Sequence, residues 1–285
     1  MARRVAITGA SGQLGTQLVR AFAAAGDEVL PLTRPGFDIL RDVDLSRLTD
    51  WRPEIVVNSA AWTDVDGCAR DPQRAMWING TAAGSVATAA ARAGALVIQI
   101  STNEVFDGVL ERPYTEDDEP NPINPYGAAK LAGERLVAAA NPHHLIIRTA
   151  WLFGPGGSNF VTKILAAADR ARLSGQPLRV VDDESGNPTP TPWLADVIVN
   201  LSQRGARSVE GVMHVAGSPV TSRLGWARHI LSGTDVAITP IRLSDFQRDS
   251  TVPPRATLSS RRFGQLGIPA GDWRNASGVM AGLHA

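Results

Sequence analysis

The sequence predicts an α/β fold, with a doubly wound parallel sheet and a smaller C-terminal α+β lobe. Short apolar runs recur at residues 5–7, 55–57 and 96–100, as expected of strands that are buried on both faces. Segments with helical patterning separate these runs, and parallel strands need such crossover connections. A glycine-rich turn directly follows the first run. Together these features favour alternating strands and helices over an all-α or all-β fold.

The composition is that of an ordinary globular protein. The chain has 285 residues, of which 44% are hydrophobic and 20% charged, with 28 basic and 28 acidic side chains. This balance favours neither a nucleic-acid nor a membrane partner. No apolar run reaches the ~20 residues that a membrane span needs, and the N-terminus lacks a signal-peptide core, so we expect a cytoplasmic protein. The single Cys68 excludes an intrachain disulfide and a multi-cysteine metal site, and we predict no metal.

The first 32 residues read as strand, turn, helix and strand. The strand at 5–7 leads into the glycine turn, a helix is expected at about 16–25, and a strand follows at 28–32. A glycine turn between a strand and a helix N-terminus offers backbone N–H groups and a positive helix end to a pyrophosphate. The turn therefore predicts a dinucleotide site that comprises Gly9, Gly12, Gln13, Leu14 and Gly15.

Tyr126 and Lys130 are spaced to lie on one face of a helix. A tyrosine with a pKa of about 10 is a poor acid at neutral pH, and a nearby ammonium would lower that pKa. We therefore expect Lys130 to tune Tyr126 for proton transfer. Tyrosine and lysine share this spacing on many solvated helix faces, so the pair gains weight only together with the nucleotide site.

The two motifs together, Gly-x-x-Gly-x-x-Gly and Tyr-x-x-x-Lys, resemble the extended short-chain dehydrogenase/reductase superfamily. This resemblance implies a Rossmann-type sheet and adds Thr102 to Tyr126 and Lys130 as a catalytic triad. It also implies that Asp38 and Ile39 contact the adenine, and that Ala60, Ala61 and Thr63 line the cofactor, with Trp62 as a wall. Asn79 would be a positioning residue, or simply an amide on a helix face.

Arg34 favours NADPH as the cofactor. It follows the second strand, where no carboxylate is present to bind a ribose 2′-hydroxyl. An arginine at this point can accommodate a 2′-phosphate. The alternative is a solvated loop arginine before Pro35, so NADH stays open as a cofactor.

Further motifs extend through the rest of the chain. They are Ser-Thr-x-x-Val-Phe-Asp-Gly, Pro-Tyr-x-Glu-x-Asp, Pro-Tyr-Gly-x-x-Lys-Leu-Ala-Gly-Glu, Arg-Thr-Ala-Trp, and the stretches at 181–189 and 253–258. Together they resemble the dTDP-4-dehydrorhamnose reductase family. The resemblance implies NADPH-dependent reduction of the C4 ketone of dTDP-4-dehydro-6-deoxy-L-mannose to dTDP-L-rhamnose. Tyr126 would donate the proton, Lys130 would bind the cofactor ribose, and Thr102 would hold the substrate oxygen. The expected contacts to the nucleotide sugar are Thr102, Asn103, Trp151 and Arg255, with Arg255 aimed at the diphosphate. Trp151 as plain core and Arg255 in a surface ion pair are the alternatives.

One departure leaves other functions open. The family usually has Asp-Tyr where this chain has Asn103 and Glu104. Nucleotide-sugar dehydratases of the superfamily carry Asp-Glu there, but Asn103 cannot protonate a leaving hydroxyl. The alternatives are another nucleotide-sugar 4-ketoreductase, epimerase or dehydratase, or a non-catalytic NADP-binding regulator resembling the regulatory subunit of methionine adenosyltransferase.

The domain prediction divides the chain at residue 151. Residues 1–151 would form the NAD(P)-binding domain, with return segments from the C-terminal half, and 152–285 would form mainly the substrate lobe. In that half we expect helices at 158–168 and 196–203, and strands at 178–181 and 212–215. Some members of the family dimerise through a magnesium site, so a homodimer is allowed, although no matching glutamates stand out.

Overall fold

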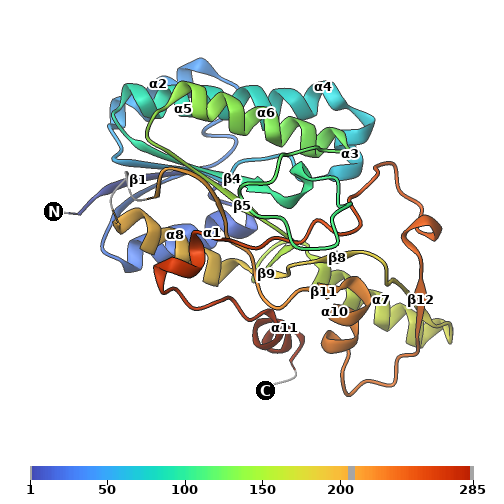
Figure 1. Cartoon of the computed structure of the whole chain (residues 1–285). Coiled ribbons are helices and arrows are strands. Elements are labelled where there is room, and N and C mark those ends of the chain that lie inside the picture. Colours follow the sequence, from blue (N-terminus) through green and yellow to red (C-terminus); the bar gives the residue numbers. More distant parts are fainter. Residues whose placement is uncertain (1, 205–208, 283–285) are drawn as a thin grey trace.

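A six-stranded parallel sheet forms the centre of the molecule (Figure 1). The computed structural model describes residues 2–204 and 209–282. The strand order is β10-β5-β4-β3-β1-β2, and every neighbouring pair is parallel. The strands are β1 (Arg4–Thr8), β2 (Glu28–Leu32), β3 (Ile55–Asn58), β4 (Leu96–Thr102), β5 (His144–Thr149) and β10 (Gly211–His214). This arrangement confirms the predicted fold class.

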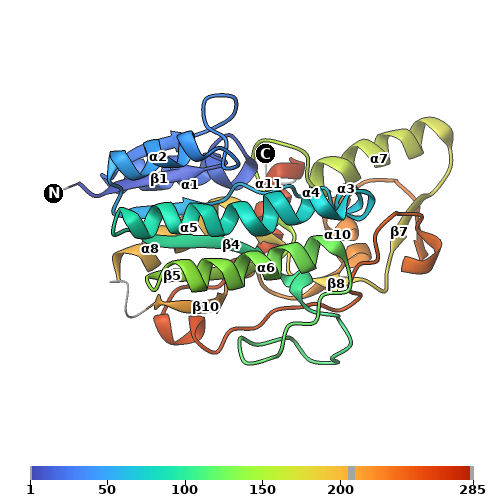
Figure 2. The same ribbon diagram turned by 90° about the horizontal axis from the view of Figure 1, so that it is seen from above.

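Helices cover both faces of the sheet, which is why its strands are apolar on both sides. On one face lie α1 (Gln13–Ala24) and α8 (Thr191–Gln203), and on the other lie α2 (Asp42–Trp51), α5 (Ala82–Arg92) and α6 (Pro125–Ala140) (Figures 1 and 2). Each face has its own hydrophobic core; Val5 and Ile7 belong to one, and Ala6 and Val56 to the other. The alternating side chains of each strand thus serve two separate cores.

The C-terminal half contributes to both parts of the molecule. Its segment 191–214 returns to the sheet as α8 and β10. Most of the remainder forms a lobe beside the sheet around the buried Trp226 (Figure 2). This lobe contains α7 (Phe160–Ser174), β7 (Leu178–Val181), α10 (Arg223–Ile230), β12 (Ile238–Ile241) and α11 (Trp273–Ala281), with the short pairs β6 (Leu152–Phe153)–β9 (Thr189–Pro190) and β8 (Ser185–Gly186)–β11 (Thr221–Ser222).

The helical segment that begins at Pro72 is interrupted. It consists of α4 (Pro72–Ala75), one π-helical stretch η1 (Met76–Thr81), and α5. Such π-helical turns arise where an inserted residue widens a helix, often at functional sites. Just before it lies α3 (Val65–Arg70), capped by the side chain of Asp64.

Other helix ends differ from the sequence prediction because of their caps. α1 begins at Gln13, with Gly12 as N-cap. α7 is longer than predicted; a capping box at Asn159 starts it, and Gly175 in the left-handed conformation (φ +67°) ends it. α8 begins earlier than predicted, with Pro192 in its first turn.

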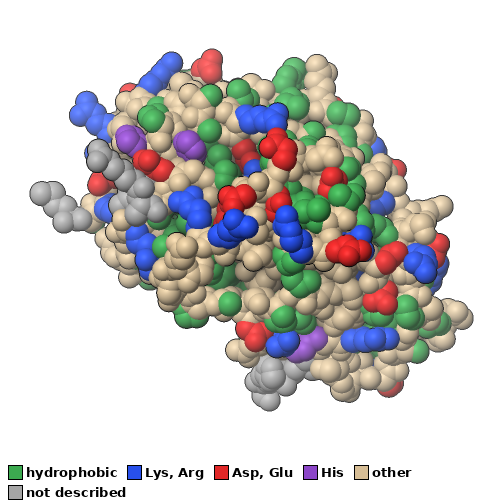
Figure 3. Space-filling model, in the orientation of Figure 1, with side chains coloured by type: hydrophobic (Ala, Val, Ile, Leu, Met, Phe, Trp, Pro, Cys, Tyr) green, Lys and Arg blue, Asp and Glu red, His purple; other side chains and the backbone are tan. Residues whose placement is uncertain are grey.

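The 3₁₀ turns are η2 (Asn103–Val105), η3 (Leu243–Asp245) and η4 (Phe263–Leu266). Within the described residues, none of the helices combines the length and the apolar character needed to cross a bilayer. On the face in Figure 3, basic and acidic side chains are interspersed, in line with the balanced composition.

Candidate active site

The nucleotide site lies where β1 has β2 on one side and β3 on the other. At such a switch point, the loops that leave the carboxyl ends of the strands diverge and open a crevice. Gly9 directly follows β1 and has a left-handed backbone, with φ +66°. A Cβ added to it would lie 2.8 Å from the Ala60 Cα. Only glycine permits so close an approach of two backbones. A cavity of about 410 Å³ opens here, lined among others by Gly9, Gly12, Arg34, Asp38, Ile39, Ala60 and Ala61.

The N-terminus of α1 offers only backbone groups to a ligand. Its N-cap Gly12 makes no side-chain cap, so the N–H groups of the first turn are available to a pyrophosphate. A Cβ on Gly15 would lie 2.1 Å from the Gly9 oxygen, which explains the third glycine. The Gln13 side chain donates to the Gly154 and Gly156 oxygens, at 3.1 and 2.9 Å, and Leu14 is buried in the core. Gln13 and Leu14 would therefore contact a cofactor only through their backbone.

The far end of the cavity holds the residues that were predicted for the adenosine. The Asp38 carboxylate accepts from the Leu40 N–H at 3.0 Å, so Asp38 orders its own turn. Arg34 is exposed on the cavity wall. A second cation lines the same cavity: the guanidinium of Arg74 lies 4.5 Å from the centre of the Trp62 ring. Nothing in the sequence singled out Arg74, because its place depends on how α4 packs.

The wall after β3 is fixed by Asn79. Its Oδ1 accepts from the Trp62 N–H at 2.8 Å, and its Nδ2 donates to the Trp62 oxygen at 3.0 Å. Asn79 is buried and reaches this loop from the π-helical turn η1. Ala60, Ala61 and Trp62 line the cavity, whereas Thr63 is exposed and is not among the lining residues. Asn79 thus holds the loop after β3 that forms one wall of the cavity.

Thr102, Tyr126 and Lys130 lie together at the carboxyl end of β4. Thr102 is the last residue of that strand, and Tyr126 and Lys130 lie on α6. The Asn124 side chain caps α6 by accepting from the Gly127 N–H at 2.7 Å. A Cβ on Gly127 would lie 2.0 Å from the Glu104 oxygen, so glycine lets the helix start directly against η2. A hydrogen bond joins the side chains of Thr102 and Tyr126.

Burial dominates the ionisation of the pair on α6. It raises the pKa of Tyr126 well above its usual value, the Glu104 carboxylate adds to the rise, and the hydrogen bond with Thr102 opposes it. Burial also lowers the pKa of Lys130 to about 8, opposed by Glu134. The prediction that Lys130 lowers the pKa of Tyr126 is therefore wrong for this structure. The phenol keeps its proton at neutral pH, as a proton donor must.

Lys130 is oriented by the strand beside it. Its ammonium donates to the Ile100 oxygen at 2.6 Å, which leaves two of its three N–H groups for a ligand. Behind it, Glu134 and Arg148 form a buried ion pair at 2.7 Å, and Ser101 donates to Glu134. Sequence reasoning missed this pair, which ties α6 to β4 and β5.

The two residues that depart from the family pattern have different environments. Asn103 is buried, and its Nδ2 donates to the Ala256 oxygen at 3.0 Å, which holds the C-terminal segment against η2. Glu104 accepts from Asn124 Nδ2 at 2.7 Å. Burial raises the pKa of Glu104, while the charges of Arg248 and Arg223 oppose that rise. Glu104 therefore presents a carboxyl group beside Tyr126.

Trp151 belongs to an aromatic and cationic stack in the C-terminal lobe. Its backbone is left-handed (φ +45°), and its ring is parallel to that of Trp226 at 6.0 Å between centres. The guanidinium of Arg223 lies 3.5 Å from the centre of the Trp151 ring and pairs with Glu184 at 2.9 Å. Arg255, by contrast, is exposed and contacts no described residue through a hydrogen bond or ion pair. Its predicted role stays a prediction.

Metal binding has no structural support in the described part of the chain. Residues 2–204 and 209–282 contain no group of three or more His, Cys, Asp or Glu side chains that could hold an ion. The absence of a metal remains a prediction. Cys68 is buried, and burial raises its thiol pKa to about 11, so it is not a reactive thiolate.

Comparison with known proteins gives matches over nearly the whole chain. The family model for the RmlD substrate binding domain matches residues 3–282. The spore coat polysaccharide biosynthesis protein SpsK of Bacillus subtilis is 38% identical, over 96% of this chain and 95% of that protein. A dTDP-4-dehydrorhamnose reductase of Mycolicibacterium smegmatis is also 38% identical, over 97% and 84%.

Solved structures of dTDP-4-dehydrorhamnose reductases have the same fold. The structure from Clostridium acetobutylicum has a TM-score of 0.91 and 33% identity, and covers 98% of this chain and 99% of that one. The structure from Bacillus anthracis, in complex with NADP, has a TM-score of 0.92 and 30% identity, and covers both chains fully. The chain therefore belongs to the RmlD substrate binding domain family.

Proposed function

We propose that the chain is an NADPH-dependent oxidoreductase, a dTDP-4-dehydrorhamnose reductase. It reduces the C4 ketone of dTDP-4-dehydro-6-deoxy-L-mannose to dTDP-L-rhamnose, the last step of dTDP-rhamnose synthesis. The observation that carries this proposal is the meeting of Thr102, Tyr126 and Lys130 at the carboxyl end of β4, in a chain 33–38% identical to curated reductases of that name.

The residues present fit a dinucleotide. The bare N-terminus of α1, the contact of Gly9 with Ala60 and the cavity beside them suit a pyrophosphate and an adenosine. Arg34 supports NADPH, since its guanidinium pairs with no described residue and would meet a 2′-phosphate. The NADP-bound relative also supports this choice, and NADH is the weaker alternative.

The bound nicotinamide supplies the hydride, and the protein handles the proton. Tyr126 is protonated at neutral pH and delivers its proton to the oxygen that develops negative charge at C4. Thr102, which is hydrogen-bonded to that phenol, holds the same oxygen. Lys130, charged below pH about 8, binds the cofactor ribose with the N–H groups that Ile100 does not use. On the sugar side, Trp151 would contact the substrate through the part of its ring that Arg223 and Trp226 leave open.

The direct test is loss of NADPH absorbance when the purified protein meets dTDP-4-dehydro-6-deoxy-L-mannose generated in a coupled reaction. Turnover that depends on both NADPH and this sugar supports the proposal. Saturable NADPH binding without turnover would contradict it, and would favour the regulatory alternative.

Glu104 favours one second candidate, a reductase of a different 4-keto sugar. A carboxyl group replaces the family's tyrosine beside the proton donor, so the ring contacts of the substrate differ. Comparing kcat/KM across 4-keto nucleotide sugars decides between the two candidates. A preference for another sugar by more than tenfold would displace dTDP-rhamnose as the product.

The expected setting follows from the proposed chemistry and composition. The substrate partner is a nucleotide sugar, and the balanced charge supports the absence of a nucleic-acid partner. We expect the enzyme in the cytoplasm, where NADPH is available, and a homodimer is allowed. Light scattering of the purified protein measures the oligomeric state.

A further inference from the structure

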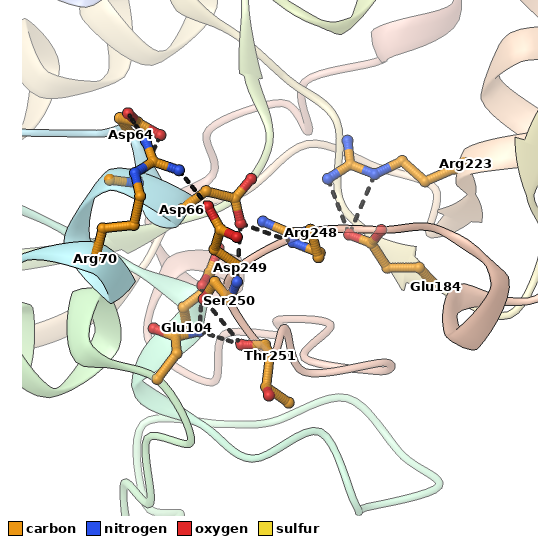
Figure 4. Close-up of polar contacts among 12 residues, drawn as sticks. Asp64, Asp66, Arg70, Glu104, Glu184, Arg223, Arg248, Asp249, Ser250 and Thr251 are labelled. Atoms are coloured by element: carbon orange, nitrogen blue, oxygen red, sulfur yellow. Dashed lines mark hydrogen bonds and ion pairs between the residues drawn. The ribbon is translucent and has the colours of Figure 1, made fainter.

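The segment between η3 and Val252 crosses from the C-terminal lobe to the nucleotide-binding part of the chain. We call residues 246–251 the strap. Ser250 N–H donates to Asp66 Oδ1 at 3.0 Å, and Asp249 pairs with Arg70 of α3. The Thr251 oxygen accepts from Asn124 Nδ2 at 2.9 Å. The strap is therefore attached to α3 (Figure 4) and, through Asn124, to the N-cap of the helix that carries Tyr126.

A carboxylate orients Arg248 of the strap, but most N–H groups of its guanidinium stay free. Its Nε donates to Asp66 Oδ1 at 3.2 Å, and only about a fifth of its side chain is exposed. Neither terminal nitrogen, Nη1 or Nη2, donates to a described residue. Neither nitrogen is among the buried unpartnered side-chain atoms of the described residues, so both are open to solvent or to a ligand. The geometry is that of a guanidinium fork held ready for an oxyanion.

Glu104 shows where Arg248 lies relative to the reacting groups. Asn124 donates both to the Thr251 oxygen of the strap, at 2.9 Å, and to the Glu104 carboxylate, at 2.7 Å, so the strap lies on the Glu104 side of the proton donor. In line with this position, the Arg248 charge lowers the pKa of Glu104 against the effect of burial. In a nucleotide sugar, the diphosphate is attached at C1, across the ring from C4. A sugar whose C4 meets Tyr126 places its diphosphate one ring away.

Two other arginines are poorer candidates for the diphosphate. Arg223 donates through Nε and Nη2 to Glu184 (Figure 4). The Trp151 ring also covers its face, so Arg223 has fewer free donors than Arg248 and one side closed to a ligand. Arg255 is exposed on the surface and belongs to no hydrogen-bonded arrangement that would orient it.

We propose that Arg248 binds the diphosphate of the nucleotide-sugar substrate through its two terminal nitrogens, and that Asp66 is the positioning residue that orients it. This inference rests on the proposed function for the class of substrate. The strap thereby takes part in substrate binding, while other residues carry out proton and hydride transfer. Arg248 and Asp66 do not line the cofactor cavity.

The experiment compares binding of dTDP and of thymidine, in the presence of NADPH, to the wild-type protein, Arg248→Lys and Asp66→Asn. Lysine keeps the charge but loses the fork, and asparagine still accepts from Ser250 N–H while losing its charge. We expect Arg248→Lys to weaken dTDP binding about 10- to 100-fold, and Asp66→Asn to weaken it less. Thymidine binding and NADPH binding should not change, and KM for the sugar substrate should rise while kcat is kept.

Arg228→Ala is the matched control, since it removes an exposed arginine of α10 in the same C-terminal lobe that has no assigned role in binding, and it should leave dTDP binding unchanged. An unchanged dTDP affinity in Arg248→Lys, or an equal loss for dTDP and thymidine, would overturn the inference. So would a wild-type protein that binds neither dTDP, UDP nor GDP. Failure of the proposed function has a different signature, namely dTDP binding that depends on Arg248 without turnover of the 4-keto sugar.

Discussion

The part of the active site that would bind the cofactor pyrophosphate is formed by backbone, whereas the substrate side is formed by side chains that come from distant segments. On the cofactor side, Gly9 lies against Ala60, and the first turn of α1 presents bare N–H groups. On the substrate side, Arg223 contacts both Trp151, which lies 72 positions earlier in the sequence, and Glu184, which lies 39 positions earlier. A common cofactor needs a surface that stays the same, and backbone supplies it. A particular sugar needs side chains that evolution can exchange.

The two sides meet at α6, so the largest expected effect comes from that helix. Replacing Tyr126 with Phe removes the proton donor without removing bulk. We expect kcat to fall about 10²- to 10⁴-fold, while NADPH and dTDP still bind. Stopped-flow reduction and fluorescence titration of NADPH measure the two quantities. A Tyr126→Phe variant with wild-type kcat would mean that another group donates the proton.

The pH dependence tests whether Lys130 serves the chemistry. Because burial lowers its pKa to about 8, the ammonium is lost above that pH, while the phenol of Tyr126 remains protonated. We expect kcat/KM to fall about tenfold per pH unit above pH about 8.

Folding stability should show the opposite trend for this group. Between pH about 8 and the ordinary lysine value of 10.5, the unfolded chain binds more protons at Lys130 than the folded chain does. The contribution of Lys130 to the free energy of unfolding therefore rises with pH in this window. Thermal denaturation across the same pH range separates the two effects. Activity that falls only together with the melting temperature would contradict the assignment.

A change in the glycine turn should affect the cofactor side alone. In Gly9→Ala the new Cβ would lie 2.8 Å from Ala60, and the left-handed backbone adds strain. We expect the Kd for NADPH to rise about tenfold or more, with little effect on dTDP binding. Gly94→Ala is the control, because Gly94 has a similar φ of +73° but no atom within 4 Å of its added Cβ. Equal effects of the two variants on NADPH binding would mean that backbone strain, rather than contact at the crevice, decides the result.

The smallest effect is expected on the substrate side. Glu184→Gln removes the charge that holds Arg223 against Trp151. We expect KM for the nucleotide sugar to rise about threefold to tenfold, and the Kd for NADPH to stay the same. Steady-state kinetics at saturating NADPH measure the change. A higher Kd for NADPH in this variant would break the separation between the two sides.

Local patterns in the sequence were sufficient for the sheet and the cofactor crevice. The apolar run that became β4 and the glycine turn after β1 each depend on a few neighbouring residues, and the structure has them as predicted. The spacing of Tyr126 and Lys130 likewise needed only one helix. The errors in helix ends came from caps, such as Gly12 at the start of α1 and Gly175 at the end of α7, where one residue decides the boundary.

The ionisation of the site could not be predicted from the same patterns. Lys130 was expected to lower the pKa of Tyr126, yet burial raises it, and burial depends on the packing of α6 against β4 and η2. Arg74 and Arg248 were missed for a similar reason. Their neighbours in space, Trp62 and Asp66, are not neighbours in any repeating pattern of the sequence.

The sequence by itself determined the parallel sheet, the glycine turn at the switch point and the spacing that places Tyr126 and Lys130 on one helix face. Hydrophobic periodicity, helix spacing and backbone freedom are properties of short segments. The tertiary structure alone decided which arginine lies near Glu104, how Asn79 holds Trp62, and how far burial moves the pKa of Tyr126 and Lys130. Desolvation and side-chain pairing depend on what surrounds a group from every side, and those surroundings come from segments that only the folded chain brings together.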